Sequence, residues 1–325
     1  MISHSIIASA LPFWGSGGFL FIDWQPSIEA FSVGSFSVRW YGLLWCLGFL
    51  TAYLIVQRLY RLQKIEDEKF EPLFFYCFVG VLVGARLGHC LFYEPGYYLT
   101  DGTHFLEMFI PFHHMPDGSW KYTGYEGLAS HGGTIGLIIA MALYCRKTKV
   151  RPWTVMDNVA IAVPAMACLI RLGNLMNSEI IGNPTDLPWG FIFHTRDALV
   201  DGVPAPRHPA QLYEAIAYLI IFILGALIYW HSYKATLAPC SSPLAPKTSS
   251  SLLAPKTAPG TGFHFGFCLA TIFTFRFFIE FLKKEQVDFE RGMALDMGQL
   301  LSVPFILLGC WCMWHALKKS NPVHV

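Results

Sequence analysis

The amino-acid sequence predicts an all-α polytopic membrane protein with seven transmembrane helices and a small cap formed by loops on the outer face. Of its 325 residues, 54% are hydrophobic and only 14% are charged, whereas soluble domains carry about 25% charged residues. The mean hydropathy is +0.43. The formal net charge is only +1 and the sequence has no basic block with interleaved aromatic residues, which excludes nucleic acid as a partner.

Seven apolar runs are long enough to cross a bilayer, although the first and the third reach that length only if they extend at their ends. They lie at about 41–56, 73–93, 128–144, 154–175, 209–230, 262–282 and 297–316. The whole chain, residues 1–325, is therefore predicted to form a single integral membrane domain.

The distribution of Lys and Arg between these runs predicts the orientation of the chain. Thirteen of them lie in the segments 57–72, 145–153, 231–261 and 317–325. Seven lie in the segments 1–40, 94–127, 176–208 and 283–296. Because short cytoplasmic loops carry the excess of positive charge, we expect an outer N-terminus and a cytoplasmic C-terminus. Lys283 and Lys284 oppose this assignment, since both fall on the predicted outer side.

The segments outside the predicted spans differ in composition. Residues 235–260 contain two copies of Leu-Ala-Pro-Lys-Thr among Ser, Pro and Ala; this composition cannot form a packed core, so we predict a disordered cytoplasmic linker. The predicted outer loops 94–127 and 183–207 are instead rich in aromatic residues and Pro, which predicts an ordered cap. Residues 1–38 contain no Lys or Arg, so they lack the charged segment of a cleavable signal peptide.

The cysteines and histidines give no sign of a metal site. The nine cysteines lie mostly in apolar runs and form no Cys-x-x-Cys pair, so we expect neither disulfides nor bound zinc. The adjacent His113 and His114 have no carboxylate at ligand spacing, and adjacent loop histidines are usually incidental. We expect no metal and no organic cofactor.

Three arginines, Arg86, Arg171 and Arg276, lie inside predicted spans, and no lysine accompanies them there. A guanidinium keeps its proton, and a charge at bilayer depth costs from about 2.5 to more than about 10 kcal/mol, depending on the reference state. Each arginine must therefore face protein, water or an anionic ligand. The first functional hypothesis is an anionic substrate that is either derived from lipid or translocated.

The end of the fourth predicted span collects polar residues. At 100° per residue, one helix face carries within about 80° of arc Arg171, Asn174, Ser178 and Gly182, with Glu179 at its edge. The alternative to a binding site is a structural ion pair of Arg171 with Glu179 or a neighbour. Polar clusters inside membranes are functional by default, which favours the binding site.

The second and sixth spans carry the other two arginines. Arg276 and Glu280 are four residues apart, the spacing of a helical ion pair, and such a pair is as readily structural as functional. Arg86 is either structural or substrate-orienting. Roughly the opposite side of its span carries a stripe of small residues that lets another helix approach closely, namely Gly80, Gly84 and Gly88.

Polar residues also stand at the starts of the third and fifth spans. His131 is followed by two glycines; it is either a helix cap or a titratable group beside a backbone that can approach a phosphate. Pro209 suits the first position of the fifth helix. The polar residues near it form either an interfacial helix entry or part of a site, and they are His208, Gln211 and Glu214.

Taken together, seven blocks of the sequence resemble the prolipoprotein diacylglyceryl transferase family, the bacterial enzymes that begin lipoprotein maturation, over nearly the whole chain. The blocks are Arg39-Trp40-Tyr41-Gly42-Leu43, Gly84-Ala85-Arg86-Leu87-Gly88, His131-Gly132-Gly133, Arg171-Leu172-Gly173-Asn174 through Asn177 and Glu179, Arg207-His208-Pro209 through Gln211-Leu212-Tyr213-Glu214, Phe275-Arg276 with Glu280, and Met297-Gly298-Gln299-Leu300-Leu301-Ser302-Val303-Pro304. The Arg-Leu-Gly-Asn segment is the signature of that family. The departures are Ser178 where glycine is common, Ser130 where an aromatic is frequent, and a longer linker, and none of them changes an ionisable position.

The resemblance implies a seven-helix enzyme of the bacterial inner membrane in the orientation that the charge count predicts. It also implies the reaction. The diacylglyceryl group of phosphatidylglycerol is transferred to the lipobox cysteine thiol of a prolipoprotein signal peptide, which makes a thioether and releases glycerol phosphate.

Fixed cations suit this reaction, because negative charge accumulates on the leaving phosphate. We expect Arg171 to bind the phosphate as a bidentate fork, with Asn174 holding the headgroup or glycerol hydroxyls. The family treats Arg276 as a second essential cation, with Glu280 orienting it. His131 is the candidate base for the thiol. The remaining candidates for the headgroup site are Tyr41, Glu179, Gly182, His208, Gln211 and Glu214, with Arg86 in a supporting role.

A transporter for an organic anion is the main alternative, because arginines at the midplane and helices that contain glycine also suit transport. Such a transporter predicts internal symmetry, whereas seven helices do not divide into halves and the polar clusters do not repeat. An intramembrane hydrolase is disfavoured, because neither a Gly-x-Ser-x-Gly motif nor paired membrane aspartates occur in the sequence.

Overall fold

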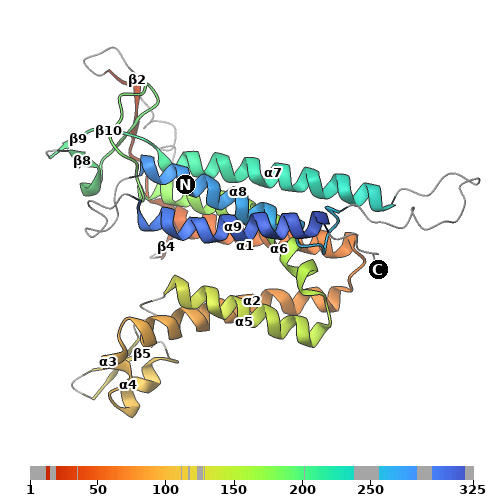
Figure 1. Cartoon of the computed structure of the whole chain (residues 1–325). Coiled ribbons are helices and arrows are strands. Elements are labelled where there is room, and N and C mark those ends of the chain that lie inside the picture. Colours follow the sequence, from red (N-terminus) through yellow and green to blue (C-terminus); the bar gives the residue numbers. More distant parts are fainter. Residues whose placement is uncertain are drawn as a thin grey trace, which may run out of the picture. The chain divides into compact units, whose positions relative to one another are not determined.

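The computed structural model describes residues 12–14, 20–34, 36–110, 112–115, 118–122, 127, 129–200, 202–237, 256–283 and 295–318. Within these residues the chain is mostly helical (Figure 1). It forms two compact units: the first comprises residues 1–56 with 156–325, and the second comprises residues 57–155.

The first unit is built on long apolar helices. They are α1 (Trp40–Leu62, of which residues up to Val56 belong here), α6 (Pro152–Met176, of which residues from Met156 onward belong here), α7 (Ala210–Leu237), α8 (Phe263–Ile279) and α9 (Met297–Lys318). Helices α8 and α9 pack closely, because a Cβ at Gly266 would lie 2.6 Å from the Gly309 carbonyl oxygen. Helices α6 and α7 meet in a buried cluster that includes Cys168, Ala215 and Tyr218.

Short strands form the other part of the first unit. One four-stranded sheet has the order β1 (Pro12–Trp14), β2 (Leu20–Trp24), β7 (Phe191–Phe193) and β10 (Pro206–Arg207). Two hairpins pair β3 (Glu29–Val33) with β4 (Phe36–Arg39), and β8 (Leu199–Val200) with β9 (Val203–Pro204). A 3₁₀ turn, η2, spans Arg196–Ala198. The all-α prediction was therefore wrong for these segments, because strands of two to five residues are too short to show an alternating pattern.

The β7 strand is buried and contributes to a second apolar core. Phe191 and Phe193 pack with Leu175, in the last turn of α6, and with Ile181, which comes after the end of that helix. The β2 strand runs parallel to β7, and its Trp24 donates a hydrogen bond from Nε1 to the Leu175 carbonyl at 3.0 Å. The sheet therefore supports the segment in which α6 ends.

The second unit pairs two helices along their glycines. Helix α2 (Asp67–Phe92) packs against α5 (Ser130–Thr148) over most of its length (Figure 1). A Cβ at Gly84 would lie 2.4 Å from the Gly132 carbonyl oxygen, so the small-residue stripe of the second predicted span is a helix contact, as its pattern indicated. In the chain, the segment from α2 to α5 contains α3 (Pro95–Tyr98), α4 (Gly102–Glu107), β5 (Phe112–His114) and β6 (Trp120–Tyr122).

Each of the seven predicted spans coincides with a helix, but not all of these helices have the composition of a span. In the described part of the chain, six helices are long and apolar enough to cross a membrane, namely α1, α2, α6, α7, α8 and α9. Helix α5 has 19 residues, yet its apolar stretch is confined between His131 near its start and Arg146 in its last turn. The chain therefore has the character of a multi-pass membrane protein with six clear candidate spans.

Both ends of the segment 235–260, which is predicted to be a linker, belong to described structure. Helix α7 continues to Leu237, and residues 238–255 lie outside the described residues. Residues 256–260 do not behave as a linker, because Ala258 is buried and Gly260 donates its N–H to the Asp157 carboxylate at 2.8 Å. Asp157 of α6 also accepts the N–H groups of Gly262 and Phe265. This carboxylate satisfies free N–H groups at the start of α8, which the composition of the segment does not reveal.

Candidate functional site

A chain of ion pairs surrounds Glu214 in the first unit. The Glu214 carboxylate of α7 has no exposed surface; its Oε2 lies 3.1 Å from Arg171 Nε, and its Oε1 lies 3.1 Å from Lys283 Nζ. Lys283 Nζ also lies 3.3 Å from Glu280 Oε2. The Arg171 side chain keeps 15% of its surface exposed. A buried carboxylate therefore holds Arg171 while part of the arginine remains accessible to an anion.

The predicted ion pair between Arg276 and Glu280 is not formed. Helix α8 ends at Ile279, and the chain tightens into a 3₁₀ turn, η3 (Glu280–Leu282), so that Glu280 pairs with Lys283 instead. The Glu280 carboxylate lies at the first turn of α9, where a Cβ at Gly298 would come within 2.8 Å of it. A helix start is a favourable place for an acidic group. Glu280 is thus held by a lysine and by a helix end rather than by Arg276.

Arg276 does not pair with Glu280, but it lies in the same part of the first unit as Arg171. Both guanidinium groups lie within electrostatic range of the Tyr218 hydroxyl, although they come from α8 and α6. Tyr218 is buried, and its hydroxyl oxygen lies 3.5 Å from Glu214 Oε1. Two of the arginines singled out in the sequence are therefore parts of one polar cluster.

The helix face predicted for residues 171–182 is wrong beyond Met176, where α6 ends. Ser178 and Ile180 have φ angles of 54° and 57°, a left-handed conformation that ends a helix. The turn nevertheless places the Glu179 side chain against the last residues of α6. Its carboxylate accepts hydrogen bonds from Asn174 Nδ2 at 3.3 Å and from Asn177 Nδ2 at 3.1 Å. The structural alternative for Arg171 was an ion pair with Glu179 or a neighbour. Arg171 pairs not with Glu179 but with another carboxylate, Glu214.

Gly182 acts through close packing of the backbone. Its N–H donates to the His208 carbonyl at 3.0 Å, and it forms a β-bridge with Lys283. A Cβ at this position would lie 2.6 Å from His208 and 2.8 Å from the Leu282 carbonyl oxygen. The buried Arg207 donates from Nη1 to the Gly182 carbonyl at 3.1 Å and from Nε to the Ala198 carbonyl at 2.8 Å, and burial lowers the pKa of its guanidinium.

Gln211 and His208 lie beside this turn at the start of α7. Gln211 is fully buried; its Nε2 donates to the Glu179 carbonyl, whereas its Oε1 accepts no hydrogen bond from the described residues. His208 Nδ1 lies 3.3 Å from the Tyr213 hydroxyl, which accepts a hydrogen bond from Trp189 Nε1 at 2.9 Å. Burial lowers the pKa of His208. Both residues support the turn that carries Glu179 and Gly182.

Tyr41 of α1 lies against the signature segment of α6. A Cβ at Gly173 would lie 3.0 Å from Tyr41 Cδ2, so glycine is needed for this contact next to Asn174. Two supporting residues were missed in the sequence. Trp24 carried no signal, because its strand was too short to recognise. The sequence did contain a signal for Lys283, because this lysine falls on the predicted outer side, against the charge distribution that predicts the orientation.

His131 and Arg86 belong to the second unit. His131 is the second residue of α5, and its side chain is exposed. Arg86 is buried; it donates from Nη2 to the Glu107 carbonyl at 2.8 Å and from Nε to the Met108 carbonyl at 3.4 Å. Its guanidinium also lies 5.1 Å from the centre of the Tyr98 ring. These contacts favour the structural alternative for Arg86.

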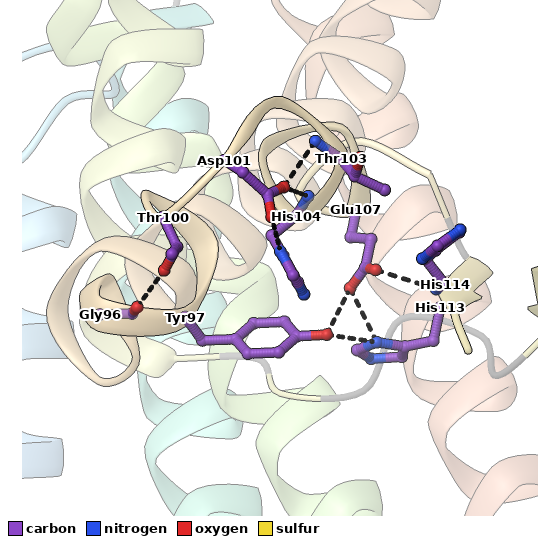
Figure 2. A network of polar contacts seen from close by, with 9 residues as sticks. All are labelled: Gly96, Tyr97, Thr100, Asp101, Thr103, His104, Glu107, His113 and His114. Carbon is purple, nitrogen blue, oxygen red and sulfur yellow. Dashed lines mark hydrogen bonds and ion pairs between the residues drawn. The ribbon is translucent and has the colours of Figure 1, made fainter. Parts of the chain in front are cut away.

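Glu107, whose carbonyl accepts from Arg86, is also part of a network of polar side chains (Figure 2). The fully buried Glu107 carboxylate lies 2.8 Å from His113 Nδ1, and it accepts hydrogen bonds from the Tyr97 hydroxyl at 3.0 Å and the His114 N–H at 2.9 Å. Burial, followed by the hydrogen bond to Glu107, raises the pKa of Tyr97 to about 12. The interpretation of His113 as incidental was wrong, because its carboxylate partner lies on α4 rather than at ligand spacing in the same loop. No group of three or more described His, Cys, Asp or Glu residues is arranged to hold a metal ion.

Comparison with known proteins gives a consistent result. The sequence profile described as prolipoprotein diacylglyceryl transferase matches residues 28–315. A protein of Bacteroides fragilis is 53% identical over 302 residues, which cover 93% of this chain and 98% of that protein. Relatives from Tolumonas auensis and Porphyromonas gingivalis are each 38% identical, over 91% and 93% of this chain and 98% and 96% of their own lengths. All three relatives are named phosphatidylglycerol–prolipoprotein diacylglyceryl transferase.

Proposed function

This chain belongs to the prolipoprotein diacylglyceryl transferase family, and we propose that it transfers the diacylglyceryl group of phosphatidylglycerol to the lipobox cysteine of a prolipoprotein. The cysteine sulfur forms a bond to the glyceryl carbon as the bond from that carbon to the phosphate oxygen breaks. The electron pair of the broken bond leaves with glycerol phosphate, and the thiol proton passes to a base. The observation that carries the proposal is the accessible Arg171, held by the buried carboxylate of Glu214.

The residues of the first unit suit the phosphate part of this reaction. Arg171 presents donors in a planar fork that matches a phosphate. Arg276 supplies a second fixed cation in the same cluster, where negative charge develops on the leaving group. Asn174 and Glu179, which are hydrogen-bonded to each other, provide an amide and a carboxylate for the hydroxyls of the headgroup. Tyr41, Gly182, His208 and Gln211 shape the site by supporting this segment.

His131 is the proposed base of the second unit. Its side chain is exposed, as a group that meets a thiol from another protein must be. A thiol has a pKa of about 8.5, and a neutral imidazole nitrogen can accept its proton. Changing His131 to Gln should lower transfer to a normal peptide but spare transfer to a thiol that is already ionised. An unchanged dependence of the rate on pH would contradict this role.

The membrane setting follows from the helices and from the charges. We propose that α5 is a seventh span, shorter than the other six, in an inner membrane with the N-terminus on the outer side. The residues 94–127 and 183–207 would then both lie on the outer side of the membrane. Labelling of single cysteines placed at Ser27 and at Lys318 with an impermeant reagent tests this orientation. Labelling of residue 318 alone in intact cells would overturn it.

The central experiment is a transfer assay. Purified protein is incubated with phosphatidylglycerol and a lipobox peptide, and the mass of the peptide is measured. We expect a gain of one diacylglyceryl group on the cysteine, and none on a matched peptide with serine in its place. If no anionic phospholipid produces a mass gain, the organic-anion transporter becomes the better description of the arginine cluster.

A further inference from the structure

Lys283 is a buried cation with no place in the reaction assigned to Arg171 and Arg276. Only 3% of its side chain is exposed, although it directly follows a turn at the end of α8. A lysine near a membrane surface normally extends its ammonium group to water. Its burial therefore indicates a specific set of partners, and these are the carboxylates of Glu214 at 3.1 Å and Glu280 at 3.3 Å.

Contacts of the main chain place Lys283 in this position. Its main chain bridges to Gly182, and the neighbouring Asn183 N–H donates to the Leu282 carbonyl at 2.8 Å. The absence of a Cβ at Gly182 allows this approach, because an added Cβ would lie 2.8 Å from the Leu282 carbonyl oxygen. Two segments 100 residues apart in the sequence are thereby joined next to the arginine site.

The charges of the cluster show what Lys283 changes. The count covers the groups joined by the ion pairs or through Tyr218, and it leaves out Glu179, whose carboxylate bonds to Asn174 and Asn177. Arg171, Arg276 and Lys283 contribute three positive charges, and Glu214 and Glu280 contribute two negative ones, which leaves a net charge of one positive. Without Lys283 the two carboxylates would balance the two arginines. A buried cluster of zero net charge would attract a monoanionic phosphodiester less strongly than one with a positive charge.

We propose that Lys283 is a positioning residue that neutralises part of the buried carboxylate charge and so keeps one positive charge available for the phosphate of the lipid donor. This inference rests on the proposed function, because the anion is that of phosphatidylglycerol. Lys283 acts through Glu214, which holds Arg171, and through Glu280, which lies at the start of α9. It does not contact the reacting atoms.

The first test is the Lys283→Met variant, which keeps much of the side-chain volume and removes the charge. We expect KM for phosphatidylglycerol to rise about tenfold or more, with a smaller change in kcat, because binding of the anion is the step affected. Adding Glu280→Gln to the same protein restores the net charge of one positive and should return KM to within about threefold of the wild-type value. Lys234→Met, which removes an exposed lysine of α7, is the matched control and should leave KM unchanged.

A second test does not depend on the folding of the lysine variant. Glu280→Gln alone raises the net charge of the cluster to two positive, so KM for phosphatidylglycerol should fall even if kcat also falls. An unchanged or higher KM in this variant would overturn the proposal, as would an equal effect of Lys283→Met with and without Glu280→Gln.

The thermal unfolding midpoint in detergent separates this inference from the proposed function. Lys283→Met should lower the midpoint, and Glu280→Gln should reverse part of that loss, whether or not the protein modifies a peptide. A wild-type protein that transfers nothing but shows this reversal would refute only the proposed function. A wild-type protein that transfers normally while the lysine variant is unaffected in KM would refute only the role of Lys283.

Discussion

Arg171 Nε lies 3.1 Å from Oε2 of Glu214, and this carboxylate has no exposed surface. A carboxylate in that position cannot meet a lipid headgroup unless the surrounding helices move. Its effect on the reaction must therefore pass through Arg171 and Lys283, the two cations that it contacts. Its place in the sequence predicts that Glu214 belongs to the headgroup site, whereas its contacts indicate that it holds Arg171 and Lys283.

The Glu214→Gln variant tests this role. Removing one charge from a buried ion pair leaves its partners uncompensated, which costs about 3–5 kcal/mol. We therefore expect a lower thermal unfolding midpoint and a loss of transfer activity, both measured on detergent-solubilised protein. Glu71→Gln, at an exposed position of α2, should change neither quantity. A Glu214→Gln protein with normal stability and activity would show that the ion pairs around this residue are dispensable.

The positions of the helices along the chain could be predicted from the sequence because long apolar runs leave a strong signal. All seven runs became helices, and the glycine stripe of the second run predicted its close contact with another helix. The signal for crossing a membrane is weaker for α5, where His131 and Arg146 limit the apolar stretch. The short strands around Phe191 and Trp24 left no periodic pattern, so their sheet could not be predicted.

The ion pairs and hydrogen bonds between residues of the site were harder to predict than the residues themselves. The spacing of Arg276 and Glu280 indicated an ion pair, yet the change from α-helix to 3₁₀ turn at Glu280 redirects that carboxylate to Lys283. Helical periodicity placed Glu179 near Arg171, whereas the left-handed residues after Met176 carry it back to Asn174 instead. In both cases local spacing was overridden by a helix end, and no sequence rule locates such an end to within one residue.

Gly182→Ala is expected to disrupt the contact that carries Lys283 to the site. The added Cβ would lie 2.6 Å from His208 and 2.8 Å from the Leu282 carbonyl oxygen, so backbone must move. We expect a loss of about 1–3 kcal/mol in the free energy of unfolding, together with a higher KM for phosphatidylglycerol. Gly42→Ala is a suitable control, because nothing lies within 4 Å of a Cβ added there and alanine favours the helix. An alanine at 182 with normal stability would contradict the close approach.

Ser178→Gly should stabilise the protein. Ser178 has a φ of 54°, a conformation that costs an ordinary residue about 1–2 kcal/mol and glycine almost nothing. The greater freedom of glycine in the unfolded chain offsets about 0.4–1 kcal/mol of that gain. We expect a net increase of about 0.5–1 kcal/mol in the free energy of unfolding, measured by thermal or denaturant unfolding. Ser178→Val should shift it in the opposite direction, and a gain with valine would refute the argument from backbone strain.

Arg86→Met is expected to reduce stability without weakening substrate binding. The variant removes hydrogen bonds from a charged group to the carbonyls of Glu107 and Met108, each worth about 1.5–3 kcal/mol. The thermal midpoint should fall, while KM for phosphatidylglycerol in the folded fraction should stay within about twofold of wild type. Arg58→Met, at an exposed position of α1, controls for loss of surface charge. A large increase in KM with normal stability would instead restore the substrate-orienting alternative for Arg86.

His208 should make stability depend on pH in the weakly acidic range. Burial lowers its pKa in the folded protein, whereas a histidine in the unfolded chain has a pKa of about 6.5. Below that value the unfolded state binds the proton more readily, so the contribution of His208 is fully present above about pH 6.5 and is lost as the pH falls through the folded pKa. The difference in thermal midpoint between wild type and His208→Gln, measured from pH 7.5 to pH 5, should therefore shift against the wild type as the pH falls. A constant difference over this range would show that the imidazole charges equally well in the folded and the unfolded protein.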